Sequence, residues 1–400
     1  MVPAAQILQA MKGMKTLRSG RNRRKWIYVL LLMGLLGLSG CGSPSSASVE
    51  MSSQTELVKT GSMELQYAEN FAVDYYEDGY KMLTTLPDSK RYLIVPEGQP
   101  VPRGLDEDVS ILQEPLQNIY LVASGVMDMF ASVDAVDQIR FSGQKQENWY
   151  IQTAKDAMAA GDMIYAGKYS KPDYELLVSE GCDLAIENRM ITHSPEVVEM
   201  LQSFGIPVMI EYSSYEQHPL GKVEWVKFFG ALTGKEAEAE EAFAEQTEIL
   251  KKVERGEKTG KTIAFFYVTS NGLIQVRQST DYIPKLIELA GGRYIFEDLE
   301  DSGSGRSTLN MQVEDFYAGA KDADILIYNS SIDGGVTTLD ELIGKCNILK
   351  DFKALQEGQV YCTTNDMYQQ SMAIGYLLQD MHTVLTDDDT AKLRYLFLLQ

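Results

Sequence analysis

Three arginines and four aromatic residues follow short apolar runs of the sequence, in stretches that read as loops. These residues are Trp149, Arg189, Tyr215, Tyr267, Arg277, Arg306 and Tyr368. A guanidinium offers paired N–H donors to anionic oxygens, and an aromatic face packs against bulky groups. We therefore expect these residues to bind a bulky, oxygen-rich and often anionic ligand.

Common catalytic signatures are missing from the sequence. It has no GxSxG, HExxH or GxxxxGK[ST] motif. Its three histidines, His193, His218 and His382, are widely separated, so a protein-held zinc or manganese ion is not expected. We predict no enzyme activity and no cofactor. Carboxylates are abundant enough for an acid–base pair, which leaves a tethered extracellular hydrolase as one alternative.

Length and charge define the class of protein further. The chain has 400 residues, of which 44% are hydrophobic and 23% charged, so it is long enough for two domains and is not typical of disordered or multi-span membrane proteins. The net charge is −21, and residues 41–400 hold 29 basic against 57 acidic side chains. Such an acidic body repels phosphate backbones, so nucleic acid is not expected as a partner.

The N-terminus has the pattern of an export signal. Seven basic residues precede the apolar run Trp26–Gly37, which is too short to span a membrane. The run ends at Leu38-Ser39-Gly40-Cys41, which resembles the lipobox of bacterial lipoproteins. The resemblance implies cleavage before Cys41, a diacylglycerol on its thiol, and anchoring by acyl chains such as palmitate to the extracytoplasmic face of the cell membrane. An ordinary secretory peptide and a start codon after residue 10 stay open.

The other three cysteines, Cys182, Cys346 and Cys362, show no CxxC spacing and predict no zinc site. Cys182 and Cys362 border expected strands and are predicted to be buried hydrophobic residues. A bridge between Cys346 and Cys362 is left open.

Short apolar runs alternate with helical patterns twice along the chain, which is typical of parallel sheets covered by helices. In the first half the expected strands are 119–123, 184–186 and 208–210, and the expected helices lie near 126–134, 149–160, 174–180 and 195–204. In the second half the expected strands are 262–267, 325–328 and 360–362, and the expected helices lie near 282–290, 312–320, 337–345 and 371–385. A helical tract joins these two α/β halves.

The predicted order along the chain follows from these patterns. It is a signal peptide (1–40), a flexible linker (41–61), an N-terminal lobe (62–217), a connecting helix (218–234) and a C-terminal lobe (235–400). The N-terminal lobe is expected to begin with a β-hairpin extension that turns at Leu86-Pro87-Asp88.

One unit occurs in both halves: a short helix that opens with a glutamate, then an aspartate, then an apolar strand. Glu175 and Asp183 mark the first copy, and Glu314 and Asp324 mark the second. With the lipobox and the helical connection, this unit resembles substrate-binding lipoproteins of ABC importers that capture ferric siderophores, haem or cobalamin. The stretches that carry the resemblance are 168–175, 218–235 and 287–292, within residues 115–385.

The resemblance implies an α/β fold of two Rossmann-like lobes with parallel sheets, joined by one long helix. It implies a monomer whose ligand, a siderophore-type iron chelate or alternatively haem or cobalamin, sits between the lobes. It also implies that Glu175 and Glu314 dock onto arginines of the permease's transmembrane subunits. Which chelate and which permease are involved stays open.

Overall fold

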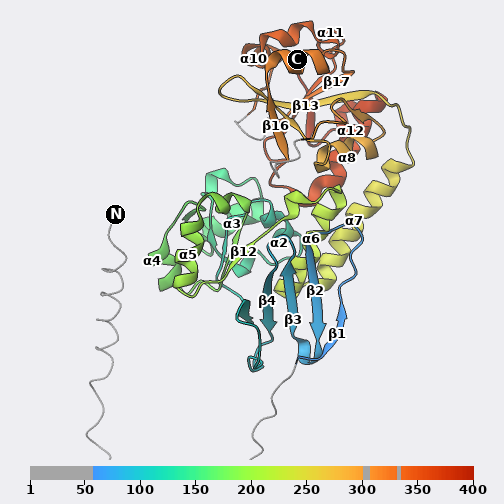
Figure 1. Ribbon diagram of the computed structural model, residues 1–400. Helices are drawn as coiled ribbons and strands as arrows, with labels where there is room; N and C mark the ends of the chain where they lie inside the picture. The colour runs from blue at the N-terminus through green and yellow to red at the C-terminus, as the bar shows by residue number, and fades with distance from the viewer. Residues whose placement is uncertain (1–56, 301–306, 331–334) are drawn as a thin grey trace, which may run out of the picture. The chain divides into compact units, whose positions relative to one another are not determined.

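The structure, a computed structural model, describes residues 57–300, 307–330 and 335–400. The predicted signal peptide, Cys41 and Arg306 lie outside these residues. Residues 54–400 belong to one compact unit, which contains an N-terminal sheet and two α/β lobes (Figure 1). Among the residues described, no helix combines the length and apolar character needed to cross a membrane.

The N-terminal sheet has five strands in sequential order: β1 (Lys59–Ser62), β2 (Phe71–Tyr76), β3 (Lys81–Thr85), β4 (Lys90–Val95) and β5 (Val109–Gln113). The predicted turn at Leu86-Pro87-Asp88 is present and links β3 to β4. Two expectations need correction. The region is a full sheet rather than a hairpin, because β5 returns to pair in parallel with β4. The linker also ends before residue 61, because β1 begins at Lys59 and pairs with β2.

The first lobe is built on a sheet that is parallel throughout, with the order β12-β11-β6-β7-β8. Its strands are β6 (Ile119–Leu121), β7 (Ile139–Ser142), β8 (Ile164–Tyr165), β11 (Leu184–Glu187) and β12 (Val208–Ile210). Its helices are α2 (Val126–Ser132), α3 (Gln152–Ala160), α4 (Tyr174–Ser179) and α5 (Pro195–Ser203), and β9 (Gly167–Lys168) pairs with β10 (Lys171–Pro172). The strand order reverses at β6, so the loops after β6 and β11 diverge there, the usual place for a ligand.

The connection between the lobes is helical, as predicted, and is divided into α6 (Pro219–Thr233) and α7 (Glu236–Glu254). Gly234 separates the two helices with a φ of 72°, a left-handed conformation that glycine adopts without strain. All residues of α6 from Pro219 to Leu232 are buried. The N-terminal sheet covers part of this helix, where Phe71 packs against Trp225 and Phe228 (Figure 1).

The second lobe is built on a mixed sheet with the order β16-β14-β13-β17-β18-β19, in which β13, β17 and β18 are parallel. Its strands are β13 (Thr262–Val268), β14 (Ile274–Arg277), β15 (Arg293–Tyr294), β16 (Thr308–Met311), β17 (Ile325–Tyr328), β18 (Val360–Thr363) and β19 (Leu396–Leu398). Its helices are α8 (Tyr282–Leu289), α9 (Val313–Ala320), α10 (Leu339–Lys345), α11 (Lys353–Gln356) and α12 (Ile374–Thr386). The antiparallel β14, β16 and β19 extend the parallel centre that the apolar runs predicted.

Asp183 and Asp324, the aspartates of the repeated unit, have the same structural role in the two lobes. Asp183 Oδ2 accepts hydrogen bonds from the backbone N–H groups of Gln117 (3.0 Å) and Asn118 (2.9 Å), just before β6. Asp324 Oδ2 accepts from the backbone N–H (2.7 Å) and the hydroxyl (2.9 Å) of Thr262, the first residue of β13. Each carboxylate therefore ties its own strand to the neighbouring strand at their amino ends.

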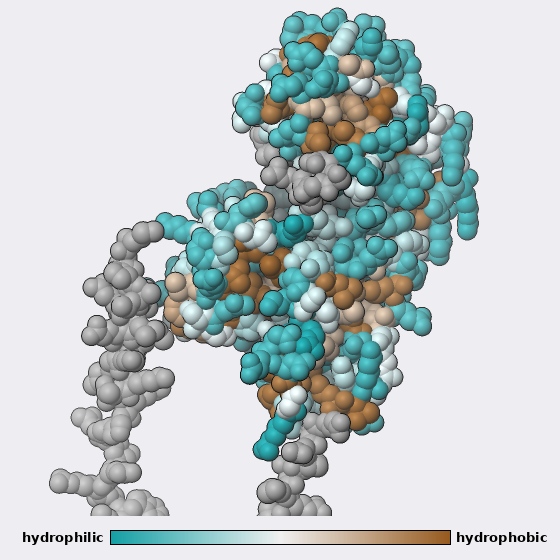
Figure 2. Space-filling view, viewed as in Figure 1, coloured by the Kyte–Doolittle hydropathy of each residue, from teal (hydrophilic) through white to brown (hydrophobic). Residues whose placement is uncertain are grey.

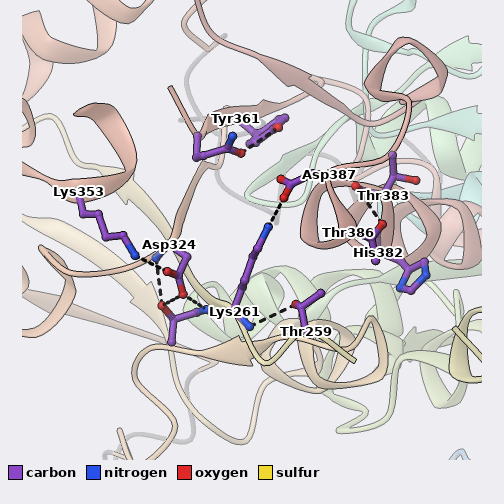
Figure 3. A network of polar contacts seen from close by, with 11 residues as sticks. Thr259, Lys261, Asp324, Lys353, Tyr361, His382, Thr383, Thr386 and Asp387 are labelled. Atoms are coloured by element: carbon purple, nitrogen blue, oxygen red, sulfur yellow. Dashed lines mark hydrogen bonds and ion pairs between the residues drawn. The ribbon is translucent and has the colours of Figure 1, made fainter. Parts of the chain in front are cut away.

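Lys353 completes the network in the second lobe by donating to Asp324 Oδ1 at 2.6 Å (Figure 3). Burial alone would raise the pKa of Asp324, but the hydrogen bonds from Lys353 and Thr262 hold it below its ordinary value. These contacts hold neighbouring strands of each lobe together at their amino ends, which is the edge of the sheet opposite to the loops that follow the strands.

Candidate functional site

The two lobes meet at the carboxyl ends of the first lobe's strands. Gln369, from the loop after β18, is fully buried there. Its Oε1 accepts from the backbone N–H of Tyr150 (2.8 Å), and its Nε2 donates to the carbonyl of Asn148 (2.8 Å). The backbone N–H of Met372 donates to Asp128 Oδ2 on α2 (2.7 Å). The segment after β18 is thus bound to the loops after β6 and β7, and we call this zone the lobe seam.

Aromatic and apolar side chains are exposed on the loops that follow these strands. Tyr150 follows β7, Met190 follows β11, Tyr215 follows β12 and Tyr368 follows β18. Their exposed fractions are 45%, 49%, 37% and 38%, and they are four of the nine large hydrophobic side chains exposed in the described part of the chain. In Figure 2 the visible surface is mostly hydrophilic, with apolar patches interspersed on it. Aromatic and apolar side chains that are exposed on neighbouring loops indicate a binding surface.

Arg189 and Tyr215 were predicted as ligand residues, and the structure brings them together. The guanidinium carbon of Arg189 lies 4.3 Å from the centre of the Tyr215 ring. The ring of Tyr212 stands at a steep angle to that of Tyr215, with 6.5 Å between the ring centres. This pair combines the cation and the aromatic wall that the sequence suggested.

Trp149 was predicted to contact ligand, and the structure contradicts this. Its side chain is fully buried, and its indole N–H donates to Ser142 Oγ at 3.0 Å. The ring packs in the core of the lobe because its one polar atom finds a partner there. Sequence spacing could show that Trp149 follows a strand but could not show which way its ring turns.

Arg277 and Tyr267 are turned largely into the second lobe. The Arg277 guanidinium pairs with Asp281 at 3.4 Å and lies 5.7 Å from the Phe265 ring centre. The ring centre of Tyr267 lies 6.1 Å from that of Tyr328, and the shallow depression that Tyr267 and Arg277 line is too narrow to hold a ligand. Their proposed contact with a ligand stays a prediction, and it would require Arg277 to share its bond with Asp281.

A group of buried charges crosses the lobe seam, and the sequence analysis missed it. Lys222 on α6 is 7% exposed, and its ammonium lies 4.8 Å from the ring centre of Tyr282 at the start of α8. Asp128, Glu211 and Asp281 lie near enough for the charge of Lys222 to lower the pKa of each. A signal was present, because Lys222, Glu224 and Lys227 are charged residues within a mostly apolar helical tract, all of whose residues from Pro219 to Leu232 are buried.

Burial dominates the electrostatics of these carboxyl groups. Desolvation raises the pKa of Asp128 to about 6, against the weaker opposing effects of the Met372 N–H and Lys222. It also raises the pKa of Glu211, although Ser213 donates both its N–H and its hydroxyl to Glu211 Oε2. Burial also raises the pKa of Asp281, although this carboxylate pairs with Arg277 and accepts a hydrogen bond from the Ile283 N–H. The seam therefore holds acidic groups that are easily protonated.

The remaining predicted residues have simple environments. Glu175 and Glu314 are both exposed and occupy the second position of α4 and of α9. Cys182, Cys346 and Cys362 form no disulfide bond among the described residues, so the bridge left open between Cys346 and Cys362 is not present. Among residues 57–300, 307–330 and 335–400, no group of three or more His, Cys, Asp or Glu side chains is arranged to hold a metal ion.

The architecture defines the class of protein at the level of fold: the chain has the bilobed α/β fold of periplasmic substrate-binding proteins. It is similar to a possible iron-binding, periplasmic solute-binding protein of Staphylococcus epidermidis (TM-score 0.53, 17% identity, 67% of this chain and 98% of that one). A periplasmic heme-binding protein of Vibrio cholerae gives a TM-score of 0.53 at 14% identity over 67% of this chain and 98% of its own. A periplasmic catecholate-siderophore binding protein of the same organism gives 0.51 at 12% identity, over 68% and 94%. The fold expected from the resemblance is thus confirmed.

Curated relatives match over most of their length. An uncharacterized lipoprotein of Methanocaldococcus jannaschii is 24% identical over 394 residues, which is 90% of this chain and 92% of the relative. A second uncharacterized lipoprotein of that organism is 23% identical over 367 residues, or 86% and 90%. No family model matches the sequence. These relatives cover more of the chain than the solved structures do.

Proposed function

We propose that this protein is an extracytoplasmic substrate-binding protein that captures an iron chelate and delivers it to the permease of an ABC importer. One observation carries the proposal: two α/β lobes meet at the carboxyl ends of parallel strands, where exposed tyrosines and a stacked arginine follow those strands. The solved structures with this fold include proteins titled as heme-binding and siderophore-binding. A siderophore-type chelate is the first candidate ligand, and haem or cobalamin is the alternative.

The lipobox supports a lipid anchor at Cys41, and two curated relatives are named lipoproteins. The first strand of the described residues, β1, begins at Lys59, so residues 42–58 lie between the proposed anchor and this strand. We infer that the protein works as a monomer at the outer face of the cell membrane and carries out no chemistry of its own.

Binding would act through a population shift. A ligand that touches both lobes binds the closed state more tightly than the open state. It shifts the equilibrium toward the closed state by the difference between these two affinities. The hydrogen bonds of Gln369 and Asp128 already hold one side of the lobe seam together. Closure would therefore rotate the lobes about this bonded side, and the movement would be modest.

Glu175 and Glu314 are proposed to dock onto permease arginines. Each is exposed in the first turn of a helix, where the dipole stabilises a carboxylate that is still free to pair with a guanidinium. The chain offers a matched comparison: Glu196 of α5 and Asp340 of α10 are also exposed and also occupy the second helical position. We call these two residues the control pair.

Thermal-shift measurements test the proposed function. The mature protein would be heated with a ferric tris-catecholate, a ferric trihydroxamate, hemin and cobalamin, each in separate titrations. A ligand present at about 100 times its Kd stabilises the folded state by about 2.7 kcal/mol, which a melting curve resolves easily. An increase in Tm that saturates with one of these ligands is expected. Unchanged melting curves with all four would refute the proposal.

A further inference from the structure

Lys222 stands out among the charged groups of the lobe seam because its ammonium has no hydrogen-bond or ion-pair partner in the described part of the chain. Its side chain is more than nine-tenths buried, and the ammonium lies over the face of Tyr282. The nitrogen is not among the buried side-chain atoms that lack a partner, so solvent still reaches it. An ammonium carries three donors, and an oxygen anion that displaced this water would gain a charge-assisted hydrogen bond in a largely buried place.

Among the described residues, none of the nearby carboxylates forms an ion pair with Lys222, and each is hydrogen-bonded elsewhere. Asp281 pairs with Arg277 and accepts from the Ile283 N–H at 2.9 Å. Glu211 accepts two hydrogen bonds from Ser213, and Asp128 accepts from the Met372 N–H. The salt bridges of the described residues include none between Lys222 and these three acids.

Lys227, on the same helix, shows how this protein treats a buried lysine that is only structural. It is 5% exposed, and its ammonium pairs with Glu240 at 2.8 Å and with Glu224 at 3.6 Å. The two lysines thus share helix, burial and chemistry, and they differ in pairing. The unpaired one is the one that faces groups from both lobes.

We propose that the ammonium of Lys222 binds an anionic oxygen of the ligand at the lobe seam, so that the captured chelate is an anionic one. This inference rests on the proposed function and narrows its ligand class. Lys222 is carried by α6, Tyr282 by the second lobe, and Asp128 and Glu211 by the first. An oxygen anion held there would touch both lobes at once and would couple binding to their closure.

The test compares wild type with Lys222→Met and with the matched control Lys227→Met. Methionine keeps the length of the side chain and removes the charge. Affinity would be titrated for two anionic probes, a ferric tris-catecholate and hemin, and for a neutral ferric trihydroxamate. We expect wild type to prefer an anionic probe and Lys222→Met to bind that probe roughly 10 to 150 times more weakly, the loss of one charge-assisted hydrogen bond. Lys227→Met should retain wild-type affinity.

Urea unfolding of the ligand-free proteins gives the second readout. We expect Lys222→Met to unfold at the wild-type midpoint or above it, and Lys227→Met to unfold at a lower one. If Lys222→Met is destabilised as much as Lys227→Met, the ammonium is structural and the inference fails. It also fails if Lys222→Met binds the anionic probe as tightly as wild type, or if wild type binds only the neutral probe, and both of these results leave the proposed function standing. If wild type binds none of these probes, the inference fails, and the cobalamin titration of the thermal-shift test then decides whether the proposed function stands.

Discussion

Glu187 offers the sharpest test of the physical reasoning, because this carboxyl group is buried without compensation. It ends β11, it is 0% exposed, and within the described residues neither of its side-chain oxygens has a hydrogen-bond partner. Desolvation raises its pKa from 4.5 to about 8. The folded protein therefore keeps this proton at neutral pH, while the unfolded chain releases it.

The size and sign of the effect follow from linkage. Between pH 4.5 and about 8 the folded state binds one more proton than the unfolded state, so stability falls as the pH rises through this window. With about 1.36 kcal/mol for each unit of pKa difference, the cost is about 3 kcal/mol at pH 7 and about 5 kcal/mol above pH 8. Below pH 4.5 both states are protonated and the cost vanishes.

Glu187→Gln keeps the shape of the side chain and removes its ionisation. Urea unfolding at intervals from pH 4.5 to 8.5 should show the variant more stable than wild type by a few kcal/mol at pH 8, with the difference shrinking toward zero at pH 4.5. Glu199→Gln, at an exposed position of α5, should match wild type at every pH. A Glu187→Gln variant that is less stable than wild type at pH 8, or whose difference does not change with pH, would refute the reasoning.

Three further outcomes are expected. Charge reversal of Glu175 and Glu314 to lysine should abolish uptake in cells and leave ligand affinity in titration unchanged, while the same reversal of the control pair should leave both unchanged; lost affinity would place the two glutamates at the ligand instead. Glu224→Ala should lower the free energy of unfolding by about 3 kcal/mol or more in urea titration, because its carboxylate accepts from the backbone N–H groups of residues 66, 67 and 68 at 2.8–3.1 Å, and a smaller loss would contradict this account. Cys41→Ala should move the protein out of the membrane fraction or leave it unprocessed, as cell fractionation and the mass of the N-terminal peptide would show, and unaltered membrane anchoring would refute lipidation at this residue.

Much of the fold could be predicted from the sequence, because it rests on local patterns. Short apolar runs form the strands β6, β11, β12, β13, β17 and β18. Such a run is the usual sequence pattern of a parallel strand that is buried on both faces. The repeated glutamate–aspartate unit was recognisable, and its aspartates perform equivalent hydrogen bonding in the two lobes. The extent of the N-terminal sheet was not predictable in this way, because β5 pairs with β4 across a loop and no local signal fixes that register.

The candidate site was only partly predictable. Residue type and position after a strand correctly placed Arg189, Tyr215 and Tyr368 in the segments that follow the strands. The same rule also selected Trp149, whose ring is buried in the core of the first lobe. The direction of a side chain depends on partners from distant segments, such as the Ser142 hydroxyl for that indole. Lys222 was missed because a lysine in a helix is usually solvated, and its burial depends on elements from both lobes.

The union of the N-terminal sheet with α6 has a consequence for how this chain can be shortened or can evolve. Glu224 and Glu216 take most of their hydrogen bonds from the backbone of residues 66–70, and Lys81 of β3 reaches the carbonyl of Ala231 and the carboxylate of Glu236. A fragment starting near residue 115 would contain both lobes but would expose apolar residues of α6 and leave the carboxylates of Glu224 and Glu216 without these backbone donors, so we expect it to aggregate instead of folding.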